Sequence, residues 1–134
     1  MALPPSILVI DDDPYLREAL VESLSMVGYR VRSATDGSEG LALVDAELPS
    51  VVVTDIHMPG IGGAAVIAKL RRDHPLLPIV AISGQFTSGS GLDADGALAL
   101  GATRALNKPF MGRDLLKTVA EILSAASDAP RASS

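Results

Sequence analysis

Short, wholly apolar runs alternate along the chain with longer stretches in which apolar residues recur every three or four positions. The short runs are rich in β-branched residues, which is typical of strands buried on both faces of a sheet. The clear ones are residues 7–10, 51–53 and 79–82, and a weaker one covers residues 31–34. Residues 104–107 are a poor strand by composition, and they are assigned one mainly because the alternation requires it.

The longer stretches predict amphipathic helices, and several helix ends carry local signals. Asp13 before Pro14 is typical of an N-cap followed by proline at the first helical position, and Gly28 ends that helix. Asp36 and Glu39 have the spacing of a capping box. The apolar stripes contain residues 16, 20, 24 and 27, then 41, 44 and 48, then 66, 67 and 70, and finally 115, 119 and 123, with a short helix expected at about residues 95–100.

This alternation of strands and helices predicts an α/β fold, with a parallel sheet that carries helices on both faces. In such sheets, ligand sites form outside the carboxyl ends of the strands. The residues that directly follow the predicted strands therefore decide what the protein can do.

Composition narrows the functional classes. The chain has 134 residues, 48% of them hydrophobic, which suits one domain with a real core; we expect it over residues 6–125, with flexible tails at residues 1–5 and 126–134. A net charge of −5 without a basic cluster disfavours binding to nucleic acid or to an anionic membrane surface. The lack of cysteine excludes disulfides, thiolate metal sites and cysteine nucleophiles.

Acidic, hydroxyl and basic side chains stand at the ends of the predicted strands. Asp11, Asp12 and Asp13 follow the first strand, Asp55 ends the third, Ser83 follows the fourth and Lys108 follows the fifth. Two carboxylates about 4 Å apart repel each other by roughly 1 kcal/mol in water and by about 4 kcal/mol at an effective dielectric constant of about 20. A counter-ion is needed to hold them together unless their pKa values rise, and Mg²⁺ is the natural one because it prefers oxygen ligands, including one or two carboxylates.

The charges of such a site balance. The carboxylates of Asp11, Asp12 and Asp55, one Mg²⁺ and the Lys108 ammonium sum to zero, so the site can accept a phosphoryl group. An aspartate carboxylate can attack phosphorus and form an acyl phosphate. The metal, the lysine and the Ser83 hydroxyl would then stabilise the phosphoryl oxygens.

Four motifs, in order and in spacing, resemble the receiver domains of two-component response regulators, including stand-alone receivers of the chemotaxis type. They are ILVIDDDP at residues 7–14, DIHMPG at 55–60 with a glycine at 63, ISG at 82–84 and KPF at 108–110. The resemblance covers about residues 6–125, nearly the whole chain. Each motif alone is a weak signal, but four in register are highly specific.

The resemblance implies a flavodoxin-like, doubly wound fold with five parallel strands in the order 2-1-3-4-5. It also implies a role for six residues. Asp11, Asp12, Asp55 and the backbone carbonyl of His57 would hold Mg²⁺, Asp55 would also be the phospho-acceptor, and Ser83 and Lys108 would contact the phosphoryl group. The bond before Pro109 becomes a candidate for the cis isomer.

By the same resemblance, a sensor histidine kinase or a histidine phosphotransfer protein is expected to phosphorylate Asp55 with Mg²⁺ as cofactor. The chain would not be a conventional enzyme, since it would catalyse only its own phosphorylation and hydrolysis. No output domain is expected in this chain, so output would come from binding an unidentified downstream protein or from shuttling phosphate. A cytoplasmic monomer or weak dimer, without nucleic-acid or membrane partners, is expected.

The chain departs from the family pattern at two places. Receivers commonly carry tyrosine or phenylalanine three residues before the lysine, as half of a conformational switch, and here that residue is Ala105. The segment 85–94 is long and contains glycines, which allow a loop to change its conformation at a low cost in free energy. We therefore expect activation to move residues 85–100.

Three other functions are considered. A phosphatase of the haloacid dehalogenase kind needs a second aspartate two residues after its nucleophile, but His57 follows Asp55 at that distance, and Asp13, which follows Asp11, is followed by proline. A flavodoxin-type nucleotide binder needs serine, threonine and glycine amides in its first loop, where three aspartates would repel a phosphate. A receiver-shaped docking module that has lost phosphorylation is disfavoured, because all the functional positions are present.

Overall fold

Strands and helices alternate along the chain as the hydrophobic pattern predicts. The computed structural model describes residues 3–58, 60–84, 94–108 and 112–128. The strands are β1 (Ser6–Ile10), β2 (Arg30–Ala34), β3 (Val51–Asp55), β4 (Ile79–Gly84) and β5 (Arg104–Lys108). The helices are α1 (Pro14–Met26), α2 (Gly37–Ala46), α3 (Gly63–Asp73), α4 (Ala94–Leu100) and α5 (Gly112–Asp128).

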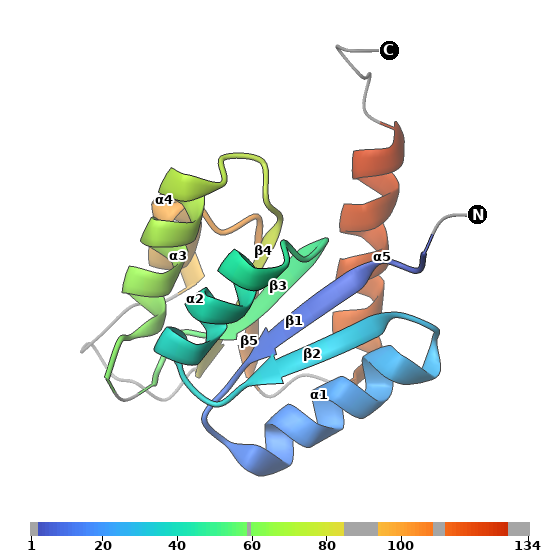
Figure 1. The fold of residues 1–134 in the computed structure, drawn as a ribbon, viewed down its shortest axis with the longest axis horizontal. Helices are drawn as coiled ribbons and strands as arrows, with labels where there is room; N and C mark the ends of the chain where they lie inside the picture. The colour runs from blue at the N-terminus through green and yellow to red at the C-terminus, as the bar shows by residue number, and fades with distance from the viewer. Residues whose placement is uncertain (1–2, 59, 85–93, 109–111, 129–134) are drawn as a thin grey trace.

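The strands form one parallel sheet in the order β2-β1-β3-β4-β5 (Figure 1), which confirms the predicted doubly wound, flavodoxin-like topology. β1 and β3 are buried along their whole length, as continuous apolar strands of a parallel sheet should be. Because all the strands run the same way, their carboxyl ends meet at one edge of the sheet. The residues that follow them are thereby brought together.

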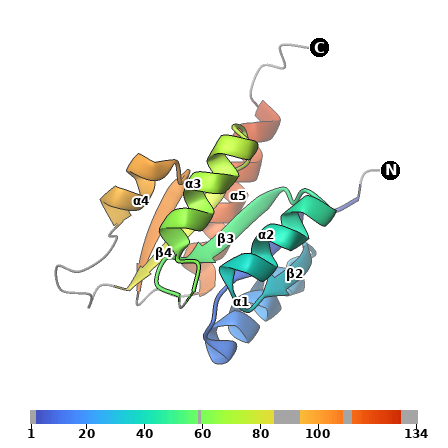
Figure 2. The same cartoon turned by 60° about the vertical axis from the view of Figure 1, so that its left-hand side comes forward.

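The core has two halves, one on each face of the sheet. Alternate side chains of a strand point to opposite faces. Ile7 and Val9 of β1 therefore pack with α1 and α5, whereas Leu8 and Ile10 pack with α2, α3 and α4. Figures 1 and 2 show the two helical layers on either side of the sheet. This enclosure fixes the positions of β1, which Asp11 and Asp12 follow, and of β3, which ends at Asp55.

The edge strands explain the weaker parts of the sequence pattern. β2 and β5 lie at the two edges of the sheet and are only partly buried. Their sequences, RVRSA and RALNK, carry charges that a fully buried strand would exclude. β5 exists although its composition is poor for a strand, because pairing with β4 supplies its backbone hydrogen bonds.

Most predicted helix ends agree with the structure. The Asp13 carboxylate accepts the N–H groups of Tyr15 and Leu16 at the start of α1, as predicted. The Asp36 carboxylate accepts the Glu39 N–H, but the Glu39 carboxylate accepts the Thr35 N–H, one residue before the N-cap. The capping box is therefore present in a displaced form.

The predicted continuation of α2 to Leu48 is wrong. The helix ends at Ala46, and the side chain of Leu48 is exposed. The Arg32 guanidinium, on β2, donates hydrogen bonds to the carbonyls of Leu43 and Glu47 at 2.9 and 2.6 Å. These bonds satisfy carbonyls at the end of the helix, where the backbone of Glu47 is already extended.

At the other end of the chain, α5 continues to Asp128, beyond the expected end of the domain at residue 125. Residues 1–2 and 129–134 of the expected tails, Pro109 and the segment 85–93 lie outside the described residues. Within the part that is described, no helix is both long and apolar enough to cross a membrane.

Candidate functional site

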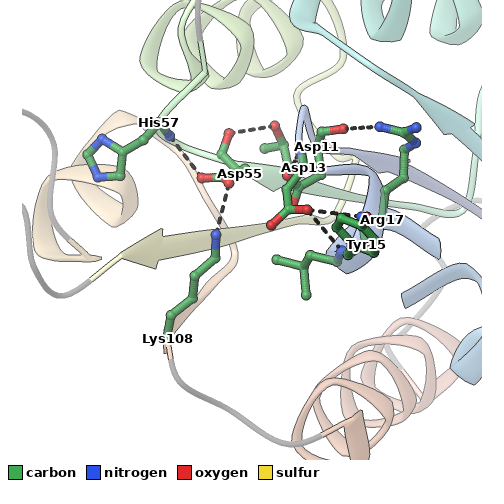
Figure 3. A network of polar contacts seen from close by, with 9 residues as sticks. Asp11, Asp13, Tyr15, Arg17, Asp55, His57 and Lys108 are labelled. Carbon is green, nitrogen blue, oxygen red and sulfur yellow. Dashed lines mark hydrogen bonds and ion pairs between the residues drawn. The ribbon is translucent and has the colours of Figure 1, made fainter. Parts of the chain in front are cut away.

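The carboxyl edge of the sheet brings three aspartates together. Asp11 and Asp12 lie in the loop after β1, and Asp55 is the last residue of β3, the neighbouring strand. One carboxylate oxygen from each lies within 4.8 Å of the others. The Nζ atom of Lys108, from the end of β5, lies 3.1 Å from Asp55 Oδ2 (Figure 3). Residues up to 97 positions apart in the sequence thus form one polar cluster.

Asp11 is the most enclosed member of this cluster. Its side chain is fully buried, and its Oδ1 accepts the Asp13 N–H at 2.9 Å. Its Oδ2 is buried and has no hydrogen-bond partner among the described residues. Burial raises the pKa of Asp11 to about 6; the Asp13 N–H opposes this rise, and the charge of Asp55 adds to it. A buried carboxylate oxygen without a partner fits a bound cation.

Asp55 is held from two sides. It is 4% exposed, and its Oδ1 accepts the His57 N–H at 2.9 Å while its Oδ2 contacts Lys108. The loop after it is packed tightly, because a Cβ added to Gly63 would lie 2.6 Å from the Asp55 carbonyl oxygen. The Gly63 N–H donates to the Ile56 carbonyl at 2.9 Å and fixes this approach. The carboxylate is therefore presented in one orientation.

The remaining predicted residues lie around this pair. Asp12 is exposed, so its carboxylate is open to solvent. Ser83 is buried and directly follows Ile82, whose register partner in β3 is Asp55. His57 is half-buried, and its backbone enters the site through the N–H bond to Asp55. The structure thus places all six predicted residues at the carboxyl edge of the sheet.

The chemistry of the cluster suits a divalent cation. Three carboxylates face one ammonium group, so the site carries an excess of negative charge when all four groups are ionised. Carboxylate oxygens are ligands for Mg²⁺, which completes its octahedral shell with waters and phosphate oxygens. The acidic cluster could therefore bind a metal ion.

Sequence reasoning missed one polar residue of the site. Arg17, in the first turns of α1, donates a hydrogen bond from Nη1 to the main-chain carbonyl of Asp11 at 2.9 Å (Figure 3). No apolar period or motif marks this residue. The one available signal is that helical side chains point back toward the helix N-terminus, which here adjoins the aspartates.

Ala105 is half-buried and packs against the core on the side of α2, α3 and α4. It pairs with Ala81 of β4, so two small side chains lie side by side where receivers commonly have an aromatic ring. The described part of this region therefore contains no ring that could swing at position 105.

Comparisons with known proteins agree with the site. The family model for the response regulator receiver domain matches residues 7–120. The response regulator MprA of Mycolicibacterium vanbaalenii is 39% identical over 124 residues, which are 90% of this chain and 51% of that protein. The probable transcriptional regulator ycf27 of Guillardia theta is 36% identical over 87% of this chain and 44% of its own. The chain thus spans about half the length of these curated relatives.

Solved structures give the same result at full domain length. The receiver domain of NtrX from Brucella abortus superposes with a TM-score of 0.81 at 32% identity, over 88% of this chain and 98% of that one. The chemotaxis protein CheY4 of Vibrio cholerae gives a TM-score of 0.79 at 30% identity, over 90% of this chain and 99% of that one.

Proposed function

Because the chain belongs to the response regulator receiver domain family, we propose that it takes a phosphoryl group on Asp55 in a two-component or phosphorelay pathway. Receiver domains of two-component systems are phosphorylated by histidine kinases, so the donor is a phosphohistidine of a sensor kinase or of a histidine phosphotransfer protein. The observation that carries the proposal is the position of Asp55. Its carboxylate contacts Lys108 and lies beside the carboxylates of Asp11 and Asp12.

Each residue of the cluster has a task in this reaction. A carboxylate oxygen of Asp55 attacks phosphorus; the P–N bond to the donor histidine breaks as the acyl phosphate P–O bond forms. Lys108 and the Ser83 hydroxyl then stabilise the phosphoryl oxygens. Asp11 and Asp12, with Asp55 and the His57 carbonyl, would hold Mg²⁺, which would supply positive charge to compensate that of the phosphoryl group. Catalysis of this kind is mostly positioning and charge compensation.

The output of the phosphorylated chain is proposed to be the binding of a downstream protein or the transfer of phosphate to another histidine. The chain would act as a phospho-acceptor, with self-catalysed transfer and hydrolysis as its only chemistry. Because Ala105 lacks a ring, a swing of an aromatic side chain at this position does not contribute to the response. The conformational change is expected in residues 85–100.

Labelling with radioactive acetyl phosphate tests the proposal. Wild type with Mg²⁺ should take up one phosphoryl group per chain, and Asp55→Asn should take up none. Asp73→Asn is the matched control, because Asp73 is an aspartate on α3 that pairs with Lys69, away from the site. Labelling that persists in Asp55→Asn, or that is unchanged in EDTA, would contradict the proposal.

A further inference from the structure

Arg17 contacts the acidic loop through the backbone. Its Nη1 donates to the Asp11 carbonyl, and among the described residues no carboxylate lies within ion-pair distance of its guanidinium. In Figure 3 it reaches Asp11 from the side away from Lys108. The guanidinium therefore binds a neutral carbonyl and does not pair with the aspartate carboxylates, which leaves their oxygens available for a metal ion.

The hydrogen bond from Arg17 holds the peptide group between the two aspartates that follow β1. The Asp11 carbonyl belongs to the peptide unit that joins Asp11 to Asp12, and a peptide unit is planar. The same residue is held at two further points, by its N–H to the Ala34 carbonyl at 3.1 Å and by its Oδ1 to the Asp13 N–H. Holding the carbonyl as well sets the plane from which the Asp12 side chain departs. Asp12 is exposed, so packing does little to orient its side chain.

The position of Arg17 is unfavourable by local rules. The N-terminus of a helix carries a partial positive charge, so a cation in the first turns is destabilising there. The Asp13 carboxylate, which caps α1, lies at the same end of the helix and offsets part of this cost. The hydrogen bond to the Asp11 carbonyl is therefore the observation that gives Arg17 a role.

We propose that Arg17 is a positioning residue for the metal site: through the Asp11 carbonyl it orients the Asp11 and Asp12 carboxylates for Mg²⁺. The inference rests on the proposed function and deepens it. The direction in which the Mg²⁺ affinity changes when Arg17 is replaced distinguishes this role from a simple effect of charge. A cation near the site repels Mg²⁺, so loss of the charge alone strengthens Mg²⁺ binding. Loss of the positioning weakens it, and only this second effect follows from the contact with the carbonyl.

Calorimetric titration with MgCl₂ tests this without measuring phosphorylation. Arg17→Met keeps the aliphatic stem and removes the donor and the charge. It should raise the Kd for Mg²⁺ by about tenfold, the lower end of the effect seen when groups that orient metal ligands are removed. Arg17→Lys keeps a donor and the charge, so its Kd should lie between those of wild type and Arg17→Met. The Lys variant also provides the test if the Met variant does not fold.

Arg71→Met is the matched control. Arg71 also tethers main-chain carbonyls, those of Gly101, His74 and Pro75, and carries the same charge, but it lies at the end of α3 opposite the site. Its loss should lower the melting temperature and leave the Kd for Mg²⁺ close to that of wild type. Melting curves show that each variant is folded during the titration.

The outcomes separate this inference from the proposed function. If Arg17→Met binds Mg²⁺ as tightly as wild type or more tightly, or if Arg71→Met weakens binding equally, the positioning role is wrong while the metal site stands. If wild type itself does not bind Mg²⁺, the metal site of the proposed function fails, and this inference fails with it.

Discussion

Replacing Asp11 with asparagine should stabilise the metal-free protein at neutral pH. The Asp11 side chain is fully buried, and burial raises its pKa from 3.8 to about 6, so the folded state carries this charge at a cost. The difference between these pKa values corresponds to about 3 kcal/mol, at about 1.36 kcal/mol per pH unit. Asparagine removes the charge and retains an oxygen that can accept the Asp13 N–H.

The stabilisation should depend on pH in a definite direction. The pKa of Asp11 is higher in the folded state than in the unfolded state, so its protonated form favours folding. That contribution is fully present below about pH 3.8 and is lost as the pH rises through about 6. Wild type and Asp11→Asn should therefore have similar free energies of unfolding near pH 4. At pH 8 the variant should be more stable by up to about 3 kcal/mol.

Urea denaturation in EDTA, at pH 4 and pH 8, measures this difference. Asp73→Asn is the control: hydrogen bonding to Lys69 lowers the pKa of Asp73, so its removal should bring no gain at pH 8. Adding Mg²⁺ should stabilise wild type by mass action and reverse the order of the two proteins. If Asp11→Asn is no more stable than wild type at pH 8 in EDTA, the charge of Asp11 is not held at a cost, and the reasoning is refuted.

Three further predictions concern the same edge of the sheet. Lys108→Met should slow phosphorylation by acetyl phosphate about 100-fold, because it removes the cation 3.1 Å from Asp55 Oδ2, while the Kd for Mg²⁺ should not increase; an unchanged rate would contradict the role of the lysine. Gly63→Ala should lower the free energy of unfolding by about 1–3 kcal/mol, since its Cβ would meet the Asp55 and Ile56 backbone. Gly62→Ala, whose added Cβ would meet nothing within 4 Å, should not lower the free energy of unfolding by this amount. Equal urea midpoints for Gly63→Ala and Gly62→Ala would refute the prediction. Below about pH 6, Mg²⁺ should bind more weakly and displace a proton from Asp11, which calorimetry in buffers of different ionisation enthalpy detects; pH-independent binding would speak against it.

The sheet could be predicted where burial is complete. Residues 7–10, 51–53 and 79–82 are buried on both faces, so their composition alone marks them as strands. The edge strands β2 and β5 are half-solvated and keep charged residues, so the sequence carries little strand signal there. The end of α2 is not predictable from its own sequence, because Arg32, on β2, donates hydrogen bonds to carbonyls at the end of the helix. Contacts of this kind are not visible in a local pattern.

The candidate site, too, is predictable from the sequence in part. The rule that the carboxyl ends of parallel strands meet at one edge is enough to predict from the sequence that Asp11, Asp55 and Lys108 lie together. The rule does not say which carboxylate is enclosed. The burial of Asp11, its unpartnered Oδ2 and the tether from Arg17 depend on how the first loop folds back against the ends of β2 and α1.

The central claim is that Asp55 receives the phosphoryl group, and chemical trapping tests it most directly. Borohydride reduces an acyl phosphate to the alcohol, which converts a phosphorylated aspartate to homoserine. After reaction with acetyl phosphate and Mg²⁺, peptide mass spectrometry should find homoserine at position 55 and unmodified aspartate at positions 11 and 12. Homoserine at position 11 or 12, or unmodified aspartate at position 55, would contradict the account.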